Sequence, residues 1–195
     1  MKTNSKEVAR YGLIVALIIV AYYIDVLLSQ GLPTRMAIAS IIVTMTICQL
    51  FDFKTAIFTT TVFGASSFAF SFIHPVYTSP AFMNPLISIF PRVIIGIVSY
   101  WVFTMMLKVC SGNKTIFFRD ILPRSIAALS GAVTNTVLVI SMISLFNESD
   151  FMATIYKLII LFNIPLEFSS ALIIVPIISY IVGKNISKYI QNTRR

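Results

Sequence analysis

Charged residues are the scarcest class in this 195-residue chain, at 11% of the sequence, whereas hydrophobic residues make up 57%. The mean hydropathy is +0.90. A soluble domain of this length has too small an interior to bury that much apolar surface. The composition therefore excludes an ordinary soluble domain and predicts an all-α, polytopic membrane protein that contacts the lipid bilayer.

Histidine and cysteine are nearly absent, which limits the chemistry available. Cys48 and Cys110 lie in or beside separate apolar runs and offer neither a disulfide framework nor metal-ligand spacing. The single histidine, His74, stands beside a proline with no nucleophile spaced near it, although pairing in space stays open. The segment SGNKT at Ser111–Thr115 lacks the first glycine of a phosphate-binding loop. We expect no enzymatic activity, no metal and no cofactor.

Six apolar runs predict a bundle of six transmembrane helices, at residues 11–28, 36–51, 55–73, 85–108, 123–146 and 155–182. The last run exceeds one span, so it either tilts or begins with a separate short segment. The fifteen basic residues form no patch with interleaved aromatics, which argues against nucleic-acid binding. With both termini in the cytoplasm, the outer side keeps only Arg35, Arg92 and Lys157 of the fifteen, as the positive-inside rule requires. We expect a multi-pass protein of a bacterial inner or plasma membrane.

A few polar residues interrupt the predicted spans. Arg92 lies in the run 85–108, where an arginine at membrane depth costs about 2.5 to 3.5 kcal/mol unless it faces a cavity or extends to the membrane surface. Asn135 lies near the middle of the fifth span, and Asn163 and Glu167 are four residues apart on one face of the sixth. Either Glu167 neutralises Arg92 within an internal network, or these residues form an outward-facing pocket for a small polar molecule. We favour the pocket.

Two further segments suggest contacts between helices. The connection 74–84 is long and retains the apolar residues Tyr77 and Phe82, so we expect it to fold back onto the bundle and close over a ligand. In the first span, Gly12 and Ala16 are four apart and form a small-residue groove where another helix can approach closely.

Three segments carry a resemblance to a known family. They are NPLISIFPRVIIGIVSY, GAVTNTVLVISMISLF and NIPLEFSSALIIVPII, beginning at Asn84, Gly131 and Asn163. In a six-helix chain with a basic inner loop, they resemble the substrate-binding S components of energy-coupling factor (ECF) vitamin transporters. The pantothenate-type branch is most similar. The resemblance covers nearly the whole chain, although the first two spans match only in hydropathy.

The resemblance implies that the protein binds a water-soluble vitamin on its outer face and has no ATPase of its own. It would join a membrane coupling subunit and two ATP-binding subunits, and topple in the membrane to release the vitamin inside. Gly12 and Ala16 occupy the place of the family's alanine-rich docking helix. For pantothenate, Arg92 would pair with the carboxylate. The remaining candidate binding residues are Asn84, Asn135, Asn163, Glu167 and Tyr77.

Alternatives remain at this point. A flatter vitamin such as riboflavin or folate would stack on Tyr77, Phe82 and Phe90. A small membrane scaffold of the cell-shape machinery would need no pocket, and an intramembrane enzyme would use His74 or Glu167.

Overall fold

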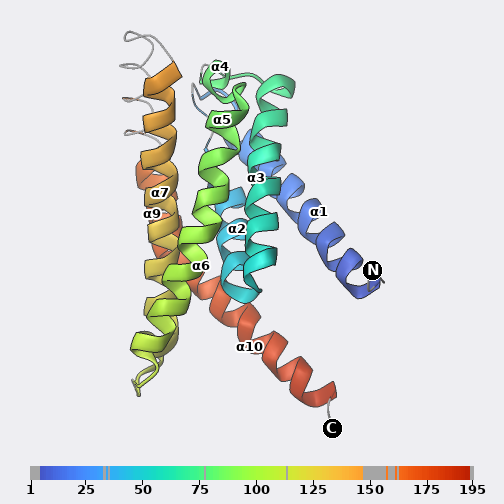
Figure 1. Cartoon of the computed structure of the whole chain (residues 1–195), viewed down its shortest axis with the longest axis vertical. Coiled ribbons are helices and arrows are strands. Elements are labelled where there is room, and N and C mark those ends of the chain that lie inside the picture. The colour runs from blue at the N-terminus through green and yellow to red at the C-terminus, as the bar shows by residue number, and fades with distance from the viewer. Residues whose placement is uncertain are drawn as a thin grey trace.

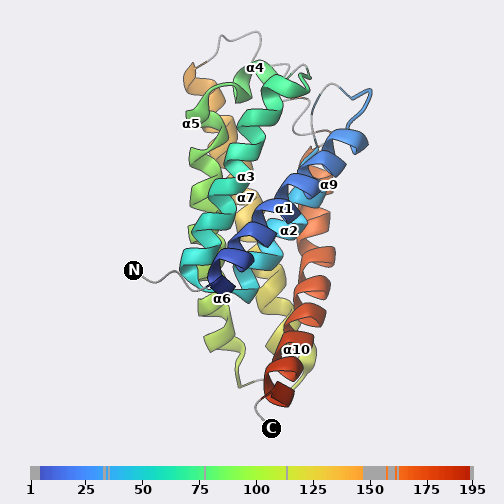
Figure 2. The ribbon, with the colours of Figure 1, turned by 90° about the vertical axis from the view of Figure 1, so that its right-hand side faces the viewer.

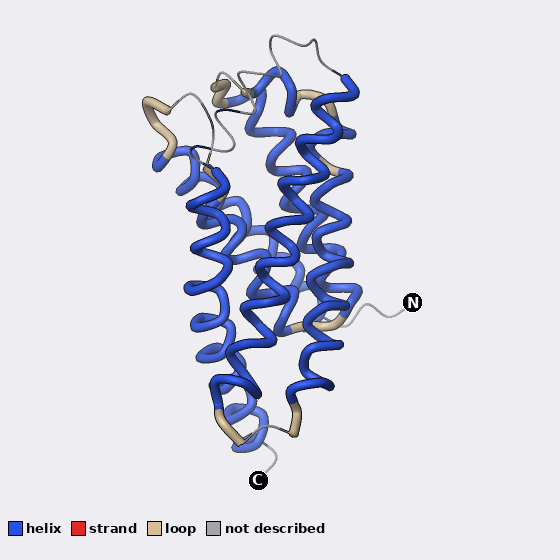
Figure 3. Tube along the Cα trace, turned by 90° about the vertical axis from the view of Figure 1, so that its left-hand side faces the viewer, coloured by secondary structure: helices blue, strands red, loops and turns tan. Residues whose placement is uncertain are grey.

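The computed structural model describes residues 5–32, 34, 36–76, 78–112, 114–146, 157, 161 and 163–193, with side chains described as far as residue 186. Every secondary-structure element within these ranges is a helix, and the ranges contain no strand (Figure 3). The predicted all-α class is confirmed.

The first half of the described chain contains α1 (Ser5–Leu28), α2 (Ile38–Leu50), α3 (Phe53–Ile73), two short helices α4 (Ser79–Phe82) and α5 (Pro85–Ser88), and α6 (Phe90–Cys110). A π-helical segment, η1 (Phe117–Ile121), leads directly into α7 (Leu122–Phe146). The last part contains α9 (Ile164–Ser169), a second π-helical segment η3 (Ser170–Ile174), and α10 (Val175–Thr193). Together they form an elongated bundle with α4 at one end, and with the start of α1 and the end of α10 toward the other (Figures 1 and 2).

Helix α2 forms the centre of this bundle. It packs against α1, α3, α6, α7, α9, η3 and α10. Ile41 and Met45 of α2 are fully buried in the main apolar core, together with Ile18 of α1, Phe63 of α3 and Ile95 of α6. The polar side chains of α2 are buried as well, because the surrounding helices cover it on several sides.

The predicted count of six spans is not confirmed. Five helices are long and apolar enough to cross a membrane, namely 5–28, 53–73, 85–110, 117–146 and 164–186. The run 36–51 forms instead the thirteen-residue α2. Such a helix is about 20 Å long, whereas the hydrocarbon core of a bilayer is about 30 Å thick. Hydropathy detects that α2 is apolar and does not distinguish a helix buried in protein from one that faces lipid.

The boundaries of other runs also differ from the prediction. Helix α1 begins at Ser5 rather than at residue 11. The run 85–108 is divided at Ile89 into α5 and α6. The predicted start of the last span at residue 155 lies outside the described residues, and the continuous helical part runs from Ile164 to Thr193.

Glycine allows α3 to pack closely against α5 and α6. A Cβ atom on Gly96 would lie 2.4 Å from the Thr60 hydroxyl oxygen, and one on Gly64 would lie 2.9 Å from the Cα of Ile89. Distances this short leave no room for a side chain. Gly64 therefore fixes the position of the α5–α6 joint, which in turn carries Arg92.

Candidate binding pocket

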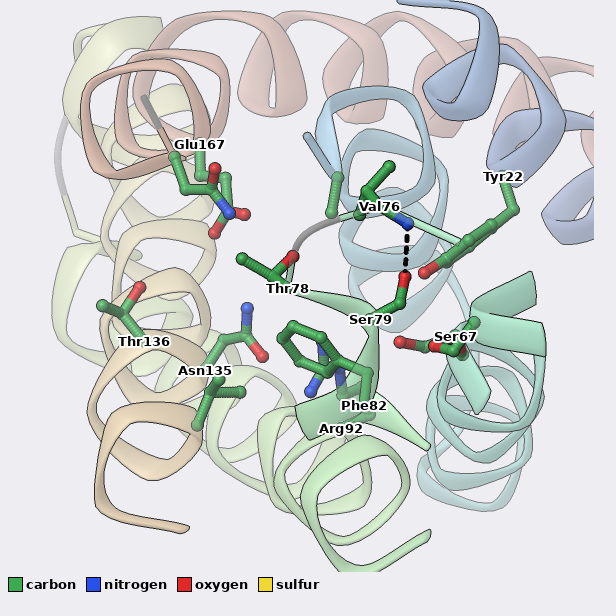
Figure 4. A pocket seen from close by; sticks show the side chains of 14 residues that line it. Tyr22, Ser67, Val76, Thr78, Ser79, Phe82, Arg92, Asn135, Thr136 and Glu167 are labelled. Atoms are coloured by element: carbon green, nitrogen blue, oxygen red, sulfur yellow. Dashed lines mark hydrogen bonds between the residues drawn. The ribbon is translucent and has the colours of Figure 1, made fainter. Parts of the chain in front are cut away.

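A cavity of about 50 Å³ lies beneath α4, at the end of the bundle away from the start of α1 (Figure 4). Helices α1, α3, α4, α6, α7 and α9 all contribute to its wall. Most of the lining side chains carry a hydroxyl, an amide or a charge: Tyr22, Ser67, Ser71, Thr78, Ser79, Arg92, Asn135, Thr136, Asn163 and Glu167. Ala37, Val76, Phe82 and Val139 complete it. The cavity is thus a polar site within an apolar bundle.

Arg92 occupies the first turn of α6 and is only 6% exposed. It is therefore buried rather than extended to the membrane surface. Its Nη1 donates a hydrogen bond to the carbonyl oxygen of Ile87 at 2.9 Å, and its guanidinium carbon lies 5.1 Å from the Phe82 ring and 5.9 Å from the Phe63 ring. The Nε atom is buried and has no hydrogen-bond partner among the described residues. A buried charged donor without an acceptor is costly, so the site suits an added acceptor.

Glu167 lines the same cavity from α9 and is 4% exposed. Its carboxylate interacts electrostatically with Arg92 and with the side-chain amide of Asn135. Among the described residues, no ion pair within 4.0 Å joins Arg92 to Glu167. The alternative in which Glu167 neutralises Arg92 by direct pairing is therefore not found among these residues.

The three asparagines predicted to bind a ligand differ in their burial and in their hydrogen bonds. Asn135 on α7 is 5% exposed, and its side-chain oxygen is buried without a hydrogen-bond partner. Asn163 lines the cavity, and its side-chain oxygen accepts a hydrogen bond from the Thr34 hydroxyl at 3.4 Å. Asn84 is not a lining residue: it caps α5, because its side-chain oxygen accepts the backbone N–H of Leu86 at 3.0 Å. Tyr77 lies outside the described residues.

Hydroxyl groups that the sequence analysis did not assign to the site form much of its wall. Ser67 and Ser71 are four residues apart on α3 and face the cavity together. Ser71 donates a hydrogen bond to the carbonyl oxygen of Ser67 at 2.7 Å, whereas the buried Thr78 hydroxyl has no partner. The i, i+4 spacing of the two serines was a usable signal, but small hydroxyl residues are equally typical of close helix packing.

The segment between α3 and α5 forms the roof of the cavity. The Ser79 hydroxyl accepts the backbone N–H of Val76 at 2.8 Å, and the Ser88 hydroxyl donates to the carbonyl oxygen of Phe82. The predicted folding of the 74–84 connection onto the bundle is therefore observed for its described residues. Phe90, a suggested stacking residue, is 44% exposed and does not line the cavity.

A second arginine, the partly buried Arg124, provides a contrast at the other end of the bundle. Arg124 Nε donates to the Ser179 hydroxyl at 2.9 Å, and Ser179 donates to the Gln49 side-chain oxygen at 2.8 Å. Gln49 returns a hydrogen bond from its amide nitrogen to the carbonyl oxygen of Arg124 at 2.9 Å. This closed network joins α2, α7 and α10 without any added group. Arg124 Nε thus has a partner, whereas Arg92 Nε and, away from the cavity, Arg10 Nε are buried without one among the described residues.

No family model, curated protein or solved structure matches the chain. The described residues also contain no group of three His, Cys, Asp or Glu side chains placed to hold a metal ion. Inferences about function therefore depend on the cavity and on the resemblance of the sequence segments.

Proposed function

We propose that this chain is the substrate-binding S component of an ECF transporter and that it binds a water-soluble vitamin or precursor in the cavity beneath α4. The observation that supports this most is the convergence of three buried polar atoms without partners on one cavity. They are Arg92 Nε, Asn135 Oδ1 and the Thr78 hydroxyl oxygen. Buried polar groups are nearly always satisfied, and a polar ligand would satisfy all three.

Pantothenate is the first ligand to test. Its carboxylate suits a charge-assisted pair with Arg92, while its amide and hydroxyl groups suit Asn135, Asn163 and the surrounding hydroxyls. Riboflavin or folate would need a broad aromatic surface, whereas the aromatic side chains among the described lining residues are those of Tyr22 and Phe82. The polar character of the wall favours the smaller acid.

The proposed topology has six passes, with both termini in the cytoplasm and the cavity opening toward the outside. Helix α2 then makes a short central pass shielded by its neighbours. The start of α1 and the end of α10 lie toward the end opposite α4, which supports termini on one side (Figure 1). The concentration of basic residues in the segments assigned to the inner side supports the same orientation.

The proposed partners are an ECF membrane coupling subunit and two ATP-binding subunits. Gly12 and Ala16 on α1 are exposed, and a Cβ atom on Gly12 would have no neighbour within 4 Å. This small-residue surface is therefore open to another helix. An intramembrane enzyme is less well supported, because His74 stacks on Phe70 and does not line the cavity that contains Glu167.

The test is calorimetry on detergent-purified protein against a panel of water-soluble vitamins. We expect one vitamin to bind with 1:1 stoichiometry, and Arg92→Met to weaken an anionic ligand by at least tenfold. Gln49→Leu is the matched control, because it alters the distant polar network and leaves the cavity wall intact. If well-folded protein binds no vitamin, a structural role such as a scaffold of the cell-shape machinery would replace this proposal.

A further inference from the structure

Arg92 and Glu167 place two opposite charges in one cavity. Arg92 enters the cavity from α6 and Glu167 from α9, and the side chains of Asn135 and Thr78 lie between them (Figure 4). Both side chains are more than nine-tenths buried. Removing a charge from water costs several kcal/mol, and the attraction of an opposite charge offsets this cost only in good contact. The two groups are not in such contact, because no ion pair within 4.0 Å joins them.

The two charges have different surroundings, and among the described residues Arg92 keeps an unused hydrogen-bond donor. Arg92 lies among Phe82, Phe63 and the Ile87 carbonyl group, and its Nε has no acceptor. Glu167 interacts with the Asn135 amide, and it is repelled by the carboxylate of Asp25. The surroundings of Arg92 therefore suit an acid group of a ligand, and those of Glu167 suit ligand groups that donate hydrogen bonds.

We infer that the ligand is bifunctional, with an acid group for Arg92 at one end and hydrogen-bond donors for Glu167 at the other. This inference rests on the proposed function and narrows its substrate class. A molecule with only an acid group leaves Glu167 facing additional negative charge. A neutral molecule with only hydroxyls leaves Arg92 without an acceptor. A molecule with both kinds of group forms charge-assisted hydrogen bonds at each end, which are about twice as strong as neutral ones.

Pantothenate and two of its analogues separate the two ends experimentally. Pantothenate carries a carboxylate and two hydroxyls. Panthenol, its alcohol, keeps the hydroxyls and the amide and lacks the acid, and the analogue in which hydrogen replaces both hydroxyls keeps the acid and the amide. By calorimetry with the purified full chain, we expect pantothenate to bind at least tenfold more tightly than either analogue.

Substitutions assign each preference to one residue. Arg92→Met should bring the affinities for pantothenate and panthenol to within about threefold while the preference for hydroxyls persists. Glu167→Gln should reduce the preference for hydroxyls at least fivefold while the preference for the acid persists. Glu167→Asp, which keeps the charge and shortens the side chain, replaces Glu167→Gln if the glutamine variant does not give a monodisperse gel-filtration peak. It should weaken pantothenate and leave the analogue without hydroxyls unchanged.

These measurements distinguish a failure of the two-ended ligand from a failure of the proposed function. If wild-type protein binds pantothenate and the analogue without hydroxyls equally, the two-ended ligand is wrong and vitamin binding stands. The same conclusion follows if the panel yields a tight ligand that lacks either an acid or a donor group. If no vitamin binds to well-folded protein, the proposed function fails, and this inference fails with it.

Discussion

Asp25 of α1 holds the first turn of α2 through its interaction with Ser40. One carboxylate oxygen accepts the backbone N–H of Ser40 at 3.0 Å and also its hydroxyl, while the other accepts the N–H of Ala39 at 2.7 Å. The residue before α2 is Ala37, whose methyl side chain cannot accept a hydrogen bond from the helix. A carboxylate from a neighbouring helix therefore satisfies the free N–H groups and interacts favourably with the positive end of the helix dipole.

We predict that Asp25→Ala destabilises the bundle by about 2 to 3 kcal/mol, since it leaves buried backbone donors without acceptors. Asp25→Asn keeps one acceptor and should cost roughly half as much. Thermal unfolding of the purified variants in one detergent measures both changes. Equal stability of the alanine variant and the wild type would show that the contact between α1 and α2 does not depend on this cap.

Substitution of Gly64 tests how Arg92 is positioned. A Cβ atom there would lie 2.9 Å from the Ile89 Cα and 3.2 Å from the Ser88 carbonyl oxygen, both of which belong to the backbone. We expect Gly64→Ala to displace the α5–α6 joint, to cost about 1 to 3 kcal/mol of stability and to weaken ligand binding. Gly12→Ala is the control, because nothing lies within 4 Å of its added methyl group. If both variants bind ligand with the affinity of the wild type, Gly64 does not position Arg92 for binding.

The roof of the cavity should become more ordered when a ligand binds. A cavity of about 50 Å³ holds only a few water molecules, so a vitamin must displace the segment around α4 to enter. We predict slower amide hydrogen exchange at residues 78–84 in the presence of ligand, with unchanged exchange in the buried α2. Exchange that is equally fast with and without ligand would contradict a closing roof.

The polar network at the far end should contribute to stability alone. Ser179→Ala removes the hydroxyl that bridges Gln49 and Arg124. We expect a loss of about 1 to 3 kcal/mol, because the buried Gln49 and the partly buried Arg124 each lose a partner. Ligand affinity should stay within twofold of wild type. A large fall in affinity at unchanged stability would instead indicate coupling between this network and the cavity.

The class of the protein follows from its composition, whereas the role of α2 does not. The run 36–51 is as apolar as its neighbours, and its central position depends on contacts with seven other elements. Similarly, spacing along the chain can place Asn163 and Glu167 on one face of a helix. It does not indicate whether Glu167 reaches Arg92, because that distance depends on how α6 and α9 pack.

For the cavity, too, the sequence predicts some of the lining residues, and the rest depend on how the helices pack. Arg92, Asn135, Asn163 and Glu167 were each selected as polar residues within apolar runs, and all four line the cavity. Asn84, at the end of the 74–84 connection, was named as a candidate through the family resemblance, yet it caps α5. An asparagine directly before a proline is a typical helix start, and this pattern was sufficient to predict its capping role.

Helix α1 contributes to the bundle through a narrow stripe. Its buried residues are Ile14, Ile18, Ala21, Tyr22 and Asp25, and most of the remaining positions are exposed. The stripe includes Tyr22, which lines the cavity, and Asp25, which caps α2. The described lining residues include none from the opposite face of α1. The two faces can therefore diverge independently during evolution. Under the proposed function, ligand preference and the surroundings of the helix would be separable traits, although both involve the same 24 residues.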